Sequence, residues 1–183
     1  MKKFLIVLFI LVQGIIFASG NSLADIKTLK FDVVEKTTIK SKKRELTYKI
    51  DFILPNKIKK EVIAPKLNKG EIYMYDYSAN KKSVYLPMFN ETKESEIVDD
   101  ENRIIKAINK IIEEEKTNKN FKQKYNAKKA QNLNIDKQIS ITISTYLEVD
   151  GYIFPETVQI KDSGTKIADV KISNLQINPK IEM

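Results

Sequence analysis

Carboxylates, lysines and hydroxyls are the side chains that could do chemistry in this chain of 183 residues, because it contains no histidine and no cysteine. That composition removes the commonest general base near neutral pH, the thiolate nucleophile, and the nitrogen and sulfur ligands of zinc sites. Neighbouring carboxylates occur at Asp99 and Asp100 and again at Glu113, Glu114 and Glu115. Two such groups can share a proton in acid–base catalysis. Both sets, however, fall at the start or on the polar side of a helical pattern, which indicates helix-end and surface charges.

Motifs that bind nucleotides or build hydrolase active sites do not occur in the sequence. It has no P-loop, no dinucleotide-binding glycine pattern and no nucleophile elbow. We therefore expect a protein that is not an enzyme and that uses no catalytic residue, metal or cofactor. A binding protein is the class that remains.

The chain is basic, with a formal net charge of +8 that becomes +6 if Lys2 and Lys3 are removed. A basic surface can attract anionic lipid headgroups over a distance, but the same lysines are also typical of an ordinary solvated face. We expect no nucleic-acid partner, because no recognition motif accompanies the charge.

Residues 1–20 have the pattern of a secretory signal peptide. Lys2 and Lys3 precede an apolar segment at positions 4–17, interrupted by Gln13 and Gly14, and small residues follow up to Gly20. We expect cleavage after Gly20 and a soluble periplasmic protein. The alternative is a retained membrane anchor, but the apolar segment is shorter than the roughly 20 residues needed to span a bilayer. Without cysteine, the exported chain can carry neither a cysteine-linked lipid nor a disulfide.

Two segments alternate apolar and polar residues strictly enough to predict strands with one buried face. In the first, the apolar residues are Leu46, Tyr48, Ile50, Phe52 and Leu54. In the second, they are Ile139, Ile141, Ile143, Leu147 and Val149. The dipeptide Asp150-Gly151 then predicts a hairpin turn.

Strands are also predicted in other segments, where apolar and polar residues alternate less regularly. They lie near residues 29–39, 58–64, 71–77, 83–86, 125–131, 152–160 and 170–177. Residues 89–94 have the composition of a loop. Pro155 favours an edge strand or a bulge, and a bulge near Ser173 or Asn174 would put Val170, Ile172 and the later apolar residues on one face.

One segment between these strands has helical periodicity. Its apolar positions form a single stripe, made of Ile104, Ile105, Ile108, Ile111 and Ile112. Asp99 or Asp100 could cap a helix over residues 100–116. A lone helix in a β-rich chain must bury such a stripe against the sheet. We therefore predict one mainly β domain with a helix: a single strongly curved antiparallel sheet of about nine strands, with the helix on its concave face.

Two regions give the chain a family resemblance. In the first, Leu54-Pro55-Asn56 precedes a strand, Pro65 ends it, and a turn at Gly70 leads into the aromatic segment 73–77. In the second, residues 151–155 (GYIFP) lead through two strands to Asn178-Pro179. In order and spacing these features resemble the LolA-like periplasmic lipoprotein carriers, also called outer-membrane lipoprotein-sorting proteins, over most of residues 30–180. The resemblance implies one carrier domain at residues 21–183.

The resemblance implies that the sheet is an unclosed half-barrel and that the helix is its lid. It also implies a function, because members of this family bind the acyl chains of lipoproteins between the half-barrel and the lid. It implies an inner-membrane exporter and an outer-membrane acceptor as partners, and we expect a monomer. The expected acyl pocket consists of Leu46, Tyr48, Ile50, Phe52, Leu54, Met74, Ile104, Ile108, Ile111, Ile141, Ile143 and Leu147. Leu54 stands where proteobacterial relatives have an arginine that can hold the lid closed, so the lid contact or the ligand is expected to differ.

Two alternatives remain open from the residues themselves. The expected pocket residues could simply pack against one another as a core. The protein could also be a regulatory, sensory or structural envelope protein on the same fold, binding protein partners instead of carrying lipid.

Overall fold

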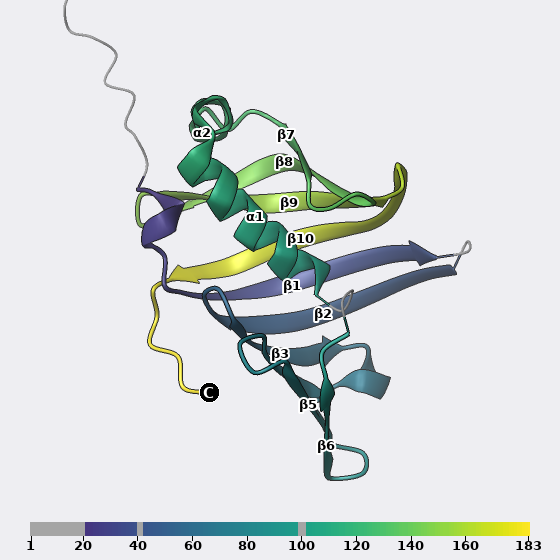
Figure 1. Ribbon diagram of the computed structural model, residues 1–183. Coiled ribbons are helices and arrows are strands. Elements are labelled where there is room, and N and C mark those ends of the chain that lie inside the picture. The colour runs from purple at the N-terminus through teal and green to yellow at the C-terminus, as the bar shows by residue number, and fades with distance from the viewer. Residues whose placement is uncertain (1–20, 40–41, 99–101) are drawn as a thin grey trace, which may run out of the picture.

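The computed structural model describes residues 21–39, 42–98 and 102–183 (Figure 1). The expected signal peptide and the carboxylates Asp99 and Asp100 therefore lie outside the described residues. Ten strands form one sheet in the order β6-β5-β4-β3-β2-β1-β10-β9-β8-β7, with every neighbouring pair antiparallel. The strands are β1 Thr28–Ile39, β2 Lys42–Ile53, β3 Lys57–Ala64, β4 Ile72–Asp76, β5 Lys81–Leu86, β6 Glu91–Glu96, β7 Gln131–Asn134, β8 Ile139–Val149, β9 Tyr152–Asp162 and β10 Thr165–Ile177.

The sheet is open, because β6 and β7 lie at its two ends and do not pair with each other. Its centre joins the two ends of the chain: β1 pairs with β10, with Leu29 opposite Ile177. All the other neighbouring strands of the sheet are consecutive in the chain. Figure 1 shows that the strands turn strongly between β3 and β6, so that this end of the sheet bends away from the rest. The predicted curved, unclosed antiparallel sheet is confirmed.

Two helices lie together on one face of the sheet (Figure 1). Helix α1, Arg103–Thr117, crosses the sheet diagonally, and α2, Lys119–Asn126, follows directly. A short 3-10 turn, Leu23–Asp25, packs near the C-terminal end of α1. Within the described residues, no helix is long and apolar enough to cross a membrane. The predicted helix on the concave face is confirmed. It begins at Arg103, and its N-cap residue is Asn102.

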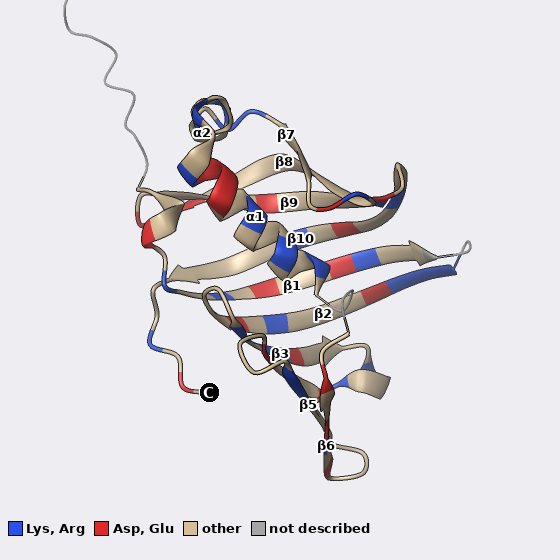
Figure 2. Cartoon of the chain, viewed as in Figure 1, with Lys and Arg blue, Asp and Glu red and all other residues tan. Residues whose placement is uncertain are grey.

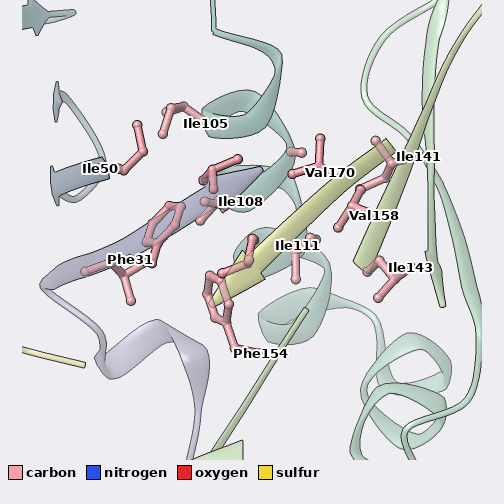
Figure 3. Packing of buried hydrophobic residues seen from close by; sticks show 14 of the residues in the cluster. Phe31, Ile50, Ile105, Ile108, Ile111, Ile141, Ile143, Phe154, Val158 and Val170 are labelled. Carbon is pink, nitrogen blue, oxygen red and sulfur yellow. The ribbon is translucent and has the colours of Figure 1, made fainter. Parts of the chain in front are cut away.

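The buried stripe of α1 faces the middle of the sheet (Figure 3). Ile105, Ile108 and Ile111 are at most 3% exposed and lie in one cluster with Phe31 and Ile50 of β1 and β2. Ile104 and Ile112 are only partly buried, so the stripe is narrower than the five isoleucines of the sequence. At about 2 kcal/mol for each fully buried side chain, the three isoleucines contribute roughly 6 kcal/mol of gross burial energy.

The strand predicted near residues 125–131 is wrong in its position. Residues 119–126 are helical, and the strand follows as β7. Asn118 caps α2 by accepting a hydrogen bond from the Phe121 backbone N–H at 3.1 Å. Phe121 and Tyr125, one turn apart, are both buried, and the Tyr125 hydroxyl donates to the Ile153 carbonyl at 3.2 Å. Burial of Phe121 and Tyr125 thus stabilises a helix in a lysine-rich segment whose sequence has no clear apolar periodicity.

The loop predicted at residues 89–94 is also wrong, because Glu91–Glu96 forms the edge strand β6. All six of its side chains are exposed. An edge strand of charged residues has no apolar alternation to reveal it, and such charges hinder pairing with another chain.

The irregular positions in the last two strands act as expected. Asn174 has a positive φ of 51° at the register shift in β10, and Val170, Ile172 and Leu175 are all buried, so the predicted bulge is confirmed. Pro155 lies opposite Tyr146, next to a register shift at which β9 has one extra residue between Thr157 and Pro155. It is at a bulge but not at an edge, since β9 lies between β8 and β10.

Asp76 at the end of β4 organises the turn into β5, and its titration can be measured. Its carboxylate accepts hydrogen bonds from the Ser78 hydroxyl at 2.7 Å and from two backbone N–H groups, and it pairs with Lys57 at 3.1 Å. The Ser78 hydroxyl and then Lys57 contribute most to lowering the pKa of Asp76 to about 2. Its stabilising effect is therefore present above the ordinary pKa near 3.8 and is lost as the pH falls through about 2.

We expect a carboxyl NMR titration of Asp76 with a midpoint near 2, moving upward in Ser78→Ala. Asp136, whose pKa is lowered chiefly by the Ile139 and Gln138 backbone N–H groups, serves as the control and should not respond to that substitution. A wild-type midpoint near 3.8 would contradict this account of the turn.

Candidate functional site

The expected pocket residues are brought together only in part. Seven are buried within the single core cluster: Tyr48, Ile50, Phe52, Ile108, Ile111, Ile141 and Ile143. Four are partly buried and pack against its margin: Leu46, Leu54, Ile104 and Leu147. Met74 is not among them, since it is 42% exposed.

The prediction that Met74 faces the interior is wrong. Met74 pairs with Lys59 and Ser83, whereas its neighbour Tyr75 pairs with the fully buried Ile58. Because alternate residues of a strand face opposite sides, Tyr75 points inward and Met74 outward. In the segment 72–76, large side chains occur at both odd and even positions, so the sequence does not show which of them face the interior.

Several interior residues lie beyond the expected set. On β1 these are Leu29, Phe31 and Val33, and on the C-terminal strands they include Phe154, Val158, Ile160, Val170 and Ile172. Leu29, Phe31 and Val33 alternate with polar residues in the sequence, so this alternation could have identified them as interior residues. The interior under α1 is therefore lined by β1, β2, β8, β9 and β10 together.

The interior is closed in this conformation. The buried side chains of α1 and of the sheet form one contiguous cluster (Figure 3). Open space lies instead along the edges of α1. A cavity of about 320 Å³ is lined by Pro55, Tyr77, Ile97, Ile105, Lys106 and Asn109. A ligand with a long chain would have to displace α1 from the sheet.

The two ends of α1 are held differently. Near its C-terminal end, the buried carboxylate of Glu115 contacts the Lys122 ammonium of α2 at 2.6 Å and accepts from the Ser22 hydroxyl at 3.0 Å. Asn118 ends α1 and caps α2. These contacts join α1, α2 and the N-terminal segment into one unit.

Three polar contacts between described residues connect the N-terminal half of α1 to the sheet region. The Asn102 amide donates to the Tyr77 hydroxyl at 3.0 Å, and the Asn109 amide donates to the Pro55 carbonyl at 3.3 Å. Arg103 lies 3.9 Å from the Asp162 carboxylate. Polar side-chain contacts therefore connect α1 to the rest of the protein at both of its ends.

Charged groups gather beside that N-terminal end. Figure 2 shows basic residues at the start of α1 and charged segments on β1 near it. The Tyr48 hydroxyl donates to the Glu35 carboxylate at 2.9 Å, and the Lys60 ammonium lies 4.0 Å from the centre of the Tyr48 ring. Burial, followed by the nearby Glu35, raises the pKa of Tyr48. Burial also lowers the pKa of Lys60, against the attraction of Glu35 and Glu71.

Known proteins match this chain in structure and not in sequence. No protein-family model and no curated protein matches it. A LolA superfamily protein from Nitrosomonas europaea superposes with a TM-score of 0.55 at 10% identity, over 86% of this chain and 89% of that one. A DUF1329 family protein from Desulfovibrio piger gives a TM-score of 0.55 at 10% identity, over 87% and 89%.

The fold is LolA-like. The resemblance seen in the sequence is thereby confirmed at the level of the fold. An outer membrane lipoprotein-sorting protein domain from Vibrio parahaemolyticus is also similar, at 11% identity over 85% of this chain and 86% of that one, but its TM-score of 0.49 carries no argument. At 10% identity, the similarity to these structures shows the fold alone. The function has to be argued from the residues of the site.

Proposed function

We propose that the protein is a periplasmic carrier that binds the acyl chains of lipoproteins or related lipids between its open sheet and α1. The observation that carries this proposal is the apolar interface between Ile105, Ile108 and Ile111 of α1 and the sheet face that they cover. Every strand pairs only with other strands of the sheet. Lifting α1 would therefore expose a continuous apolar surface without breaking any strand pairing.

The energies of closing and loading are of similar size. Transferring one long acyl chain into an apolar site is worth roughly 10 kcal/mol, at about 0.8 kcal/mol for each CH₂ group. Separating the three isoleucines from the sheet costs roughly 6 kcal/mol of burial on the helix side, and exposing the sheet residues that they cover adds to this cost. An acyl chain that replaces these contacts could therefore hold α1 open. The empty protein would stay closed and keep the same surface out of water.

The proposal assigns no catalytic step, metal or cofactor to the protein. It implies export through the segment at residues 1–20, an inner-membrane protein that loads the carrier, and an outer-membrane acceptor that unloads it. The similarity of the fold to the LolA superfamily protein from Nitrosomonas europaea supports the proposal of a lipoprotein carrier.

Processing of the N-terminus gives a direct test of the location. We expect the mature protein to begin at Asn21 and to be released with the periplasmic fraction, because residues 1–20 have the charged and apolar parts of a cleaved signal. N-terminal sequencing of the purified protein measures this. Recovery of Met1 in a membrane pellet would contradict the proposed location.

One observation favours a second candidate. The interior is filled by its own side chains, as in an envelope protein that binds protein partners through its outer surface. Native mass spectrometry of protein purified from the periplasm separates the two candidates. Bound lipid supports the carrier. Protein that is free of lipid, and that takes up neither a fluorescent fatty acid nor a triacylated lipoprotein, would favour the second candidate.

A further inference from the structure

We propose that the cavity beside the N-terminal end of α1 binds an oxyanion, the carboxylate or phosphate group of an amphiphile whose chain lies under α1. This inference rests on the proposed function, because it assigns the charged end of the same ligand. The cavity has a volume of about 140 Å³ and is lined by Glu35, Tyr48, Ile50, Lys60, Arg103 and Ile160, among others. Its size suits a headgroup, at roughly 30 Å³ for each displaced water.

Lys60 is the first group that points to an anion. It lies in the middle of β3 with its ammonium over the Tyr48 ring at 4.0 Å and 5.9 Å from the centre of the Tyr73 ring. Among the described residues, no carboxylate oxygen lies within 4.0 Å of this ammonium. Burial lowers the pKa of Lys60, as expected for a cation that has lost water without gaining a close anionic partner. An oxyanion in the cavity would supply that partner.

Arg103 is the second group. Its Nε atom is buried and has no hydrogen-bond partner among the described residues, and the nearest carboxylate it pairs with is 3.9 Å away. Arg103 is also the first residue of α1, and between described residues the first hydrogen bond of the helix runs from the Ile105 N–H to the Asn102 carbonyl. The N–H groups of the first turn add positive potential at the same place.

The charges around the cavity define the ligand further. Among the residues that line the cavity, Lys60 and Arg103 are the cations, and Glu35, which already accepts the Tyr48 hydroxyl at 2.9 Å, is the carboxylate. Asp162 lies outside this lining, 3.9 Å from Arg103. The lining itself therefore carries one excess formal positive charge, which a single carboxylate or phosphodiester would neutralise. Ile50, Ile104 and Ile160 form the apolar part of the wall, and Ile50 and Ile160 belong to the core beneath α1. The cavity therefore connects a charged end to the expected path of a chain.

Matched ligands test the site on the mature full-length protein. We would measure binding of tetradecanoate, of tetradecanol with the same chain and no charge, and of inorganic phosphate, each by calorimetry at pH 7.4. Tetradecanoate should bind about tenfold more tightly than tetradecanol, which corresponds to about 1.4 kcal/mol for a charge-assisted contact. Phosphate should weaken tetradecanoate binding and leave tetradecanol binding unchanged.

Substitutions at Lys60 then locate the effect. Lys60→Gln should remove the preference for tetradecanoate, whereas Lys60→Arg should retain most of it because the charge is kept. Lys59→Gln, on the opposite face of the same strand, is the matched control and should change nothing. Melting temperatures of all three variants show whether the fold is intact, and the ratio of the two affinities is insensitive to a general loss of stability.

The outcomes separate the two proposals. Equal binding of acid and alcohol, unchanged by Lys60→Gln, overturns the oxyanion site and leaves the carrier. Binding of phosphate alone, abolished by Lys60→Gln, supports an oxyanion site at Lys60 but overturns the amphiphile as its ligand, and the carrier with it. If no ligand of the three binds, both proposals are wrong.

Discussion

Ile108→Glu should lower the free energy of unfolding by about 4 kcal/mol and abolish binding of a fluorescent fatty acid, because it places an unpaired carboxylate in an apolar interior. Ile108 is 3% exposed and lies between Ile105 and Ile111 on the face of α1 that meets Phe31 (Figure 3). The carboxylate can reach water only if α1 leaves the sheet. We expect the strands to persist in circular dichroism, since their hydrogen bonds do not involve α1, and the α1 segment to become sensitive to protease.

Two control variants show whether the effect of Ile108→Glu comes from the buried charge. Lys116→Gln changes an exposed residue of the same helix and should affect neither stability nor binding. Ile108→Val keeps the interior apolar and should cost only about 1 kcal/mol. If wild-type protein does not bind the fatty acid and Ile108→Glu only lowers the melting temperature, the interior is a core alone and the carrier proposal fails.

Removal of the Lys122 ammonium should destabilise the protein by about 2 kcal/mol, because the Glu115 carboxylate it contacts would stay buried without a charged partner. Glu115 is 3% exposed, and the two groups are 2.6 Å apart. The figure is below the usual cost for a buried pair, since the Lys122 side chain is 40% exposed and water can take part of its place. Chemical denaturation of Lys122→Ala measures the effect.

A double-mutant cycle isolates the contact. Adding Glu115→Gln to Lys122→Ala should recover stability, because the neutral amide no longer needs a charged partner. Lys110→Ala, which breaks surface pairs of a partly exposed lysine with Glu113 and Glu114 on the same helix, should cost at most about 0.5 kcal/mol. A coupling energy near zero between Glu115 and Lys122 would show that this contact does not anchor α1.

The same variants address movement of the lid. If α1 pivots at its C-terminal end, loosening Glu115 and Lys122 should accelerate release of a bound fatty acid more than Lys110→Ala does. Equal release rates in the two variants would place the pivot elsewhere. Stopped-flow displacement of the fluorescent probe makes the comparison.

The sequence alone determined the parts whose residues repeat with a regular period. Strict alternation over residues 46–54 and 139–149 specified two strands, and over 46–54 and 139–143 it also specified their buried faces, since a strand turns successive side chains to opposite sides. Beyond Ile143 the register of β8 shifts, and Leu147 and Val149 are only partly buried. The isoleucine stripe of α1 specified a helix that packs on a sheet. Asp150-Gly151 and the irregularity near Asn174 were visible because turns and bulges select particular residues.

Only the tertiary structure decided the positions that local pattern leaves ambiguous. Tyr75 faces inward and Met74 outward because Ile58 is buried opposite Tyr75, a pairing between separate segments. The charged strand β6 exists because β5 presents an edge to it. Lys60 is a further case: its charge suggests solvent, yet its strand register brings it beside Tyr48 and α1. Such positions depend on which strands meet across the sheet, and long-range pairing is not encoded in the period of any single segment.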